Sequence, residues 1–112
     1  MKNIFLLMVL ITLFGCKKKE EVPAHLIGEE QMVAILVDIH LLEARIDALG
    51  LPKDSVDAVY KSFEWDLLVN KHKVDTLTYF KSFKYYTNHL SNFNNVYDEV
   101  LKEMESIQKD KF

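Results

Sequence analysis

The feature that most constrains the fold is an apolar periodicity of about six helical turns between residues 29 and 49. One face of this helix carries Met32, Ile35, Leu36, Ile39, Leu42, Ile46 and Leu49. Gly28 can cap its start, Gly50 suits the left-handed position after a helix, and Pro52 prevents continuation. A second apolar surface widens this face: Val33, Val37, Leu41, Ala44 and Ala48. We therefore predict a central helix that other elements contact on two sides.

Three further helices are predicted by the same criterion. Residues 55–69 form one with Asp54 as its cap, and residues 75–87 form the next with Asp75 as its N-cap. The core side of the latter is predicted to carry Leu77, Phe80, Phe83 and Tyr86, with Tyr79 beside them. Residues 87–92 are rich in side chains that compete with helical hydrogen bonds, which predicts a break before a last helix over 91–109. One long kinked helix is the alternative.

These elements predict an all-α fold, a small bundle of three to four helices over residues 29–110. The chain has only three glycines and two prolines, which suits helices with short loops better than a many-stranded sheet. It carries 17 acidic and 14 basic residues, so its charge opposes binding to the phosphate backbone of nucleic acids.

The N-terminus has the pattern of an exported protein. After a basic start, residues 4–14 form an apolar run that would make a helix of about 16 Å, too short to cross a hydrocarbon core of about 30 Å. This length is typical of a signal peptide, which we predict over residues 1–15. Residues 16–28 then form a charged tether. Lys17, Lys18 and Lys19 could contact anionic headgroups, or could simply keep the tether soluble.

The end of the apolar run, Leu13-Phe14-Gly15-Cys16, resembles the lipobox of bacterial lipoproteins. The resemblance implies a thioether-linked diacylglycerol on Cys16, cleavage after Gly15 and acylation of the new amino group by a fatty acid such as palmitate. Two or three acyl chains make a durable anchor. We therefore expect a lipid-anchored protein of the cell envelope, at the outer membrane, with the side it faces left open. The alternative is an ordinary signal peptide or uncleaved anchor with an incidental cysteine.

Three polar residues interrupt the apolar helix over 29–49: Asp38, His40 and Glu43. His40 and Glu43 can share a face, whereas Asp38 and Glu43 lie about 140° apart around the helix. One helix thus offers two metal ligands at most, where zinc requires three or four, so no metal or cofactor beyond the covalent lipid is expected. A polar edge that pairs with neighbouring residues is the simpler interpretation, and an acid–base or metal role is the alternative.

The aromatic residues offer a second candidate site. Residues 79–86 interleave aromatic side chains with lysines, a pattern of single-strand nucleic-acid binding that the acidic balance argues against. An exposed surface formed by Trp65, Tyr79 and Tyr85 would suit a protein or glycan partner, and filling of the core is the alternative.

Four short motifs follow one another along the chain: Pro23-x-x-Leu26-Ile27, Met32 with Leu36-Val37-Asp38-Ile39-His40-Leu41 and Glu43-Ala44, Phe80-x-Ser82-Phe83-Lys84-Tyr85-Tyr86, and Val96-Tyr97-Asp98-x-Val100-Leu101. Together they resemble a family of small helical Bacteroidota lipoproteins known as a domain of unknown function. The resemblance implies a helical fold and an envelope location, and it brings no activity. We expect a non-enzymatic accessory module with a protein partner in the envelope. The alternatives are a binding protein for a hydrophobic or glycan ligand between the first and third helices, and a small metal-dependent enzyme using Asp38, His40 and Glu43.

Overall fold

The computed structural model describes residue 3 and residues 22–111. Within residues 22–111 the chain is all α, as predicted. It comprises α2 (Glu29–Ala48), α3 (Lys53–Trp65), the π-helix η1 (Asp66–Lys71), α4 (Thr76–Thr87) and α5 (Leu90–Lys111). The predicted signal peptide, apart from residue 3, and Cys16 lie outside the described residues. Within the described part, no helix combines the length and apolarity needed to cross a membrane.

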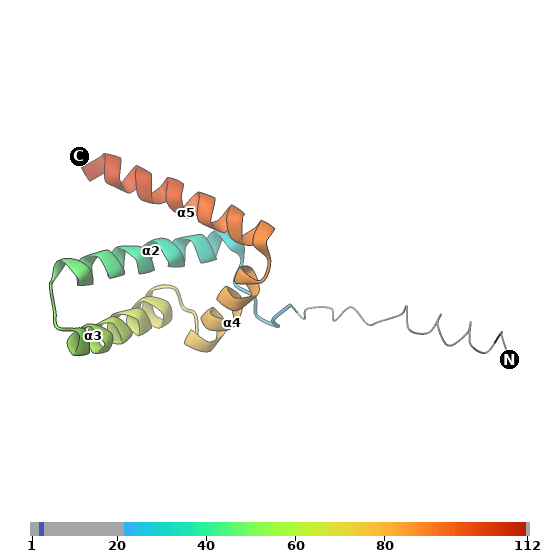
Figure 1. Ribbon diagram of the computed structural model, residues 1–112, viewed down its shortest axis with the longest axis horizontal. Coiled ribbons are helices and arrows are strands. Elements are labelled where there is room, and N and C mark those ends of the chain that lie inside the picture. The colour runs from blue at the N-terminus through green and yellow to red at the C-terminus, as the bar shows by residue number, and fades with distance from the viewer. Residues whose placement is uncertain (1–2, 4–21, 112) are drawn as a thin grey trace.

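Helix α2 is the centre of the bundle (Figure 1). It lies between α5 on one side and α3 on the other, and it contacts α3, η1 and α5. Helix α3 returns antiparallel to α2, whereas α5 runs parallel to it. The short helix α4 lies at the end of the bundle where α2 begins, and the C-terminus of α5 lies at the opposite end.

The packing of α2 confirms that it is contacted on two sides. Seven of its residues are buried: Met32, Val33, Ile35, Leu36, Val37, Ile39 and Ile46. Ile27, directly before the N-cap Gly28, is buried in the same core cluster as Met32. At the other end, Gly50 has φ +61°, and no atom lies within 4 Å of the position its Cβ would take. Glycine is therefore favoured here by the left-handed backbone conformation, and a lack of room for a side chain is not the reason.

The predicted boundaries of the second helix were wrong at both ends. Its N-cap is Pro52, whose carbonyl accepts from the backbone N–H groups of Ser55 and Val56 at 2.9 and 3.0 Å, so Asp54 lies inside the first turn. At its C-terminal end the helix continues as η1 to Lys71. The N–H of His72 reaches the carbonyl of Leu67, five residues back, as expected of a π-helix. Lys73 then takes the left-handed conformation, with φ 57°.

The last two helices are separate, as predicted, and Asp75 caps α4 by accepting from the N–H of Leu77 at 3.1 Å. The core side predicted for α4 was right for Tyr79 and Tyr86 and wrong for Leu77 and Phe80. Tyr79, Ser82 and Tyr86 are buried, whereas Leu77 and Phe80 are 58% and 55% exposed. The physical reason is that Ser82 and Tyr86 on the inner side of this helix form hydrogen bonds with Ile27.

Candidate functional site

The first notable feature is a clamp that fixes residues 22–28, here called the N-terminal strap, to α4. The N–H of Ile27 donates to Oγ of Ser82 at 3.1 Å, and the hydroxyl of Tyr86 donates to the carbonyl of Ile27 at 2.6 Å. Ser82 is fully buried, and Tyr86 is 3% exposed. Burial, and then the charge of Glu29, raises the pKa of the Tyr86 hydroxyl, which keeps it protonated as a donor. The strap is thus held through both polar groups of one peptide residue.

The second feature is a polar contact between α2 and the end of η1. Oδ2 of Asp38 lies 2.7 Å from Nε2 of His72 and 2.8 Å from Nζ of Lys71. The side chain of Gln31 donates to the carbonyl of His72 at 3.2 Å. Burial by itself would raise the pKa of Asp38, but the hydrogen bonds and charges of Lys71 and His72 outweigh it and lower the pKa below its usual value of 3.8. Asp38 therefore ties η1 to the central helix.

This contact predicts a pH-dependent contribution to stability. Because the pKa of Asp38 is lower in the folded than in the unfolded protein, its stabilisation is complete above pH 3.8 and is lost as the pH falls through the folded pKa. We expect Asp38→Asn to lower the free energy of unfolding by about 1 kcal/mol at pH 7. Urea denaturation of both proteins between pH 7 and pH 3 measures the difference, which should shrink below about pH 4. A difference that stays constant down to pH 3 would contradict this assignment.

His40 and Glu43 belong to a different contact from Asp38. Nδ1 of His40 lies 3.3 Å from Oε2 of Glu43, and the His40 ring meets the edge of the Tyr97 ring on α5, with centroids 6.1 Å apart. The three predicted polar residues therefore do not converge: one points to η1, and two lie toward α5. In residues 22–111 no group of three or more His, Cys, Asp or Glu side chains is placed to hold a metal ion.

A groove of about 420 Å³ runs between α2 and α5 beside His40. It is lined by His40, Glu43, Ala44, Asp47, Tyr97, Val100, Leu101 and Met104. Leu101 is 57% exposed, and Met104 is partly buried against the core. Apolar side chains of α5 thus face a groove whose α2 side carries two carboxylates, Glu43 and Asp47.

Sequence reasoning missed a group of acidic and phenolic side chains around Glu43. Burial, and then the charge of Glu43, raises the pKa of Glu64 on α3. Burial, Glu64 and Glu43 raise the pKa of Tyr60 to about 12. The pKa values of Tyr79 and Tyr97 are raised by burial first and also by Glu43. The only sequence signal for this cluster was the spacing of Tyr60 and Glu64, four residues apart on one helix face.

The predicted aromatic surface was wrong for Tyr79. Its side chain is 6% exposed, and its ring packs beside Phe80 and Phe83 with centroids 5.4 and 6.0 Å away. Tyr79 is buried because it faces the same side of α4 as Ser82 and Tyr86. Trp65 on α3 is 54% exposed. Tyr85 is partly buried and stacks on His89, with ring centroids 4.0 Å apart.

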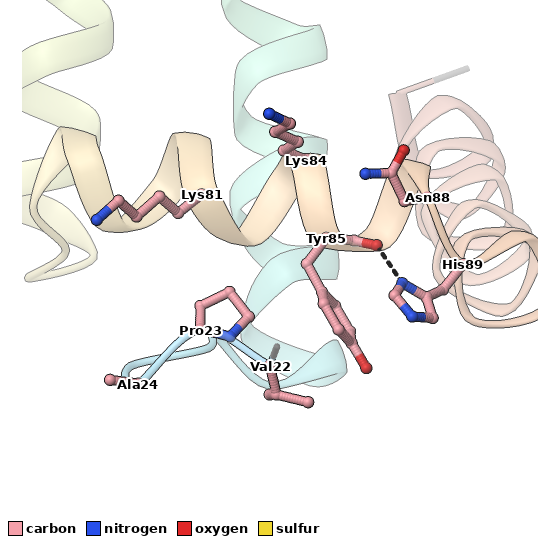
Figure 2. A pocket seen from close by; sticks show the side chains of 8 residues that line it. All are labelled: Val22, Pro23, Ala24, Lys81, Lys84, Tyr85, Asn88 and His89. Carbon is pink, nitrogen blue, oxygen red and sulfur yellow. Dashed lines mark hydrogen bonds between the residues drawn. The ribbon is translucent and has the colours of Figure 1, made fainter. Parts of the chain in front are cut away.

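Tyr85 also lines a surface cavity of about 530 Å³ between the N-terminal strap and α4. Figure 2 shows Val22 and Pro23 lying beside α4 on the side toward which Tyr85 points, with Lys81 running along the helix and Lys84 projecting away from them. Nδ1 of His89 lies 2.6 Å from the carbonyl oxygen of Tyr85, where the chain leaves α4. The cavity is therefore at the place where the strap enters the domain.

Comparisons with known proteins give a family and no activity. No curated protein and no solved structure matches the chain. One family model, described as "Domain of unknown function (DUF4296)", matches residues 23–110. This range includes all of the N-terminal strap except Val22 and all of the helices except Lys111, the last residue of α5. Because the match spans well over half of the 112 residues, the chain belongs to the DUF4296 family.

Proposed function

We propose that this protein is an envelope lipoprotein, anchored by acyl chains on Cys16, whose helical domain is a non-enzymatic accessory module that binds a protein partner. The groove between α2 and α5 is the partner site. The partner contributes an amphipathic helical segment with basic residues.

The observation that carries this proposal is the chemistry of the groove. Leu101 and Met104, three residues apart on α5, offer an apolar surface that suits the apolar face of a partner helix. Glu43 and Asp47 on the α2 side suit lysine or arginine at the edge of that helix. A large side chain such as Leu101, 57% exposed at the groove, is the kind of residue that gains most from coverage by a partner.

The polar residues of α2 support a binding role over a catalytic one. Asp38 is engaged with Lys71 and His72, and His40 is engaged with Glu43, so each acid or base has an intramolecular partner on a separate side of the helix. A general acid–base pair would have to act on one substrate from a shared site. The anchor rests on the basic start, the short apolar run and the lipobox-like residues 13–16.

One experiment in the bacterium that makes this protein tests both parts. A photo-crosslinking amino acid replaces Leu101 in the groove, in the native chain and in a Cys16→Ala chain. We expect the native chain to fractionate with membranes and to form a discrete adduct whose partner peptide is basic and amphipathic. The Cys16→Ala chain should move to the soluble fraction and lose incorporated fatty acid.

The matched control places the crosslinker at Glu103, an exposed residue of α5. Glu103 does not line the groove and lies beside Glu29, Glu30 and Val33 of α2. Equal adducts at both positions would refute the groove as the partner site. A Cys16→Ala chain that still fractionates with membranes would refute the anchor, whatever the adducts show.

A further inference from the structure

Within residues 22–111, helix α4 exposes an apolar and basic stripe beside the N-terminal strap. Leu77, Phe80, Lys81 and Lys84 fall within about 100° of the helix circumference, opposite the buried Tyr79, Ser82 and Tyr86. All four are exposed, with Leu77 at 58% and Phe80 at 55%. Of the eight large hydrophobic side chains exposed in the described part of the chain, two, Leu77 and Phe80, lie on this stripe, and Val22 of the strap lines the adjoining cavity with Lys81 and Lys84.

The charge of this face is opposite to that of the protein. Between Thr76 and Thr87, α4 contains two lysines and no acidic residue, while the whole chain has a net charge of −3. Apolar side chains flanked by lysines are typical of helices that lie at a membrane surface, because the apolar groups enter the headgroup region while the ammonium groups meet anionic lipids.

The strap places this face close to the proposed anchor. Ile27 is clamped to α4 by Ser82 and Tyr86, and Pro23 lies against the same helix beside Lys81. Val22, the first residue of the strap, comes only six residues after Cys16. Covalent geometry limits the separation of their Cα atoms to at most about 22 Å, comparable to the length of α4, about 18 Å.

We propose that the stripe Leu77, Phe80, Lys81 and Lys84 lies on the surface of an anionic lipid bilayer, next to the acylated Cys16. This inference rests on the proposed anchor and goes beyond it, because the anchor alone would leave the domain free to rotate. Contact through α4 orients the bundle. The C-terminal end of α5, which lies at the end of the bundle opposite α4, then points away from the lipid (Figure 1).

A bilayer fits this face better than a second protein partner does. The reach of the anchor keeps α4 near lipid whether or not another protein is present. Lysine ammonium groups bind lipid phosphates without a fixed geometry, which suits side chains that project from an exposed helix face.

The test measures which residues the bilayer covers. The full native chain, with lipid on Cys16 verified by mass spectrometry, carries one added cysteine, at Asn88 beside the stripe or at Gln108 near the opposite end of α5. Both positions are exposed, and Cys16 is the only other cysteine. Each protein is labelled with a fluorophore and reconstituted into vesicles of phosphatidylethanolamine and phosphatidylglycerol. We expect quenching by aqueous iodide to be about threefold weaker at position 88 than at position 108.

Two variants and one control decide the cause of any protection. Lys81→Glu with Lys84→Glu, or Leu77→Ser with Phe80→Ser, should raise quenching at position 88 to the level at position 108. Lys61→Glu with Lys109→Glu makes the same charge change at exposed residues elsewhere and should leave the protection intact. Equal quenching at positions 88 and 108 in the lipid-carrying chain would overturn the proposal. Protection of position 88 that appears in cells and not in vesicles would overturn it as well. The second result would assign the face to a protein.

Failure of the anchor is distinguishable from failure of this inference. Mass spectrometry that finds an unmodified Cys16 refutes the anchor before any fluorescence is measured. Sedimentation of that chain with the same vesicles then decides the α4 face. If Lys81→Glu with Lys84→Glu abolishes this binding and Lys61→Glu with Lys109→Glu does not, the result supports the α4 face as the lipid-binding surface. Absence of binding would overturn that assignment.

Discussion

Replacing Leu68 by alanine is expected to lower the free energy of unfolding by about 2–5 kcal/mol. Leu68 is fully buried, and it is the buried residue of η1, which contacts α2, α3 and α4. Removing most of its side chain loses apolar burial and leaves a cavity among three helices that cannot all close around it. The urea concentration at the midpoint of unfolding, followed by circular dichroism, measures the effect.

The control for this substitution is Leu101→Ala, the same chemical change at a residue that is 57% exposed. We expect it to cost less than about 1 kcal/mol, because much of this side chain is already in water. Equal losses for the two variants would mean that η1 is not a packed part of the core. A folded Leu101→Ala protein would also establish that substitution at the groove does not disrupt the domain.

Replacing Ser82 by alanine is expected to lower the free energy of unfolding by about 1–3 kcal/mol. The change deletes only a hydroxyl group, but it leaves the N–H of Ile27 buried without an acceptor. For a domain of this size, such a loss lowers the melting temperature by about 4–8 °C per kcal/mol. Thermal unfolding followed by circular dichroism measures the shift. Amide hydrogen exchange at Ile27 should also accelerate, since the strap loses one of its two bonds to α4.

The matched control is Thr87→Ala, which removes a hydroxyl from the same helix. Oγ1 of Thr87 donates to the carbonyl of Lys84 at 2.9 Å, but this bond is exposed, so water can replace it. We expect a change within about 0.5 kcal/mol. If Ser82→Ala were as mild as Thr87→Ala, the strap would not depend on this clamp. Tyr86→Phe should couple with Ser82→Ala, because both side chains bind the same peptide residue.

Only part of the candidate site could be predicted from the sequence, because some of its residues come from distant parts of the chain. The apolar pattern of α2 identifies Asp38, His40 and Glu43 as exceptions, and helical spacing alone pairs His40 with Glu43. The partner of Asp38 is His72, 34 residues further along the chain, and it reaches α2 only because η1 ends beside it. The groove likewise combines α2 with α5, so its lining residues form no motif in the linear chain.

The sequence by itself determined the presence and order of the α-helices, the central position of α2, the cap at Asp75 and the left-handed Gly50. Each of these depends on side chains within a few residues, so hydrophobic periodicity and capping chemistry suffice. Only the tertiary structure decided that Leu77 and Phe80 lie outside the buried side of α4, and how α3 continues into η1. Ser82 replaces Leu77 and Phe80 on the inner side because it binds Ile27, 55 residues away. An interaction between distant segments can outweigh the apolarity of a local pattern, because a buried peptide group must have a hydrogen-bond partner.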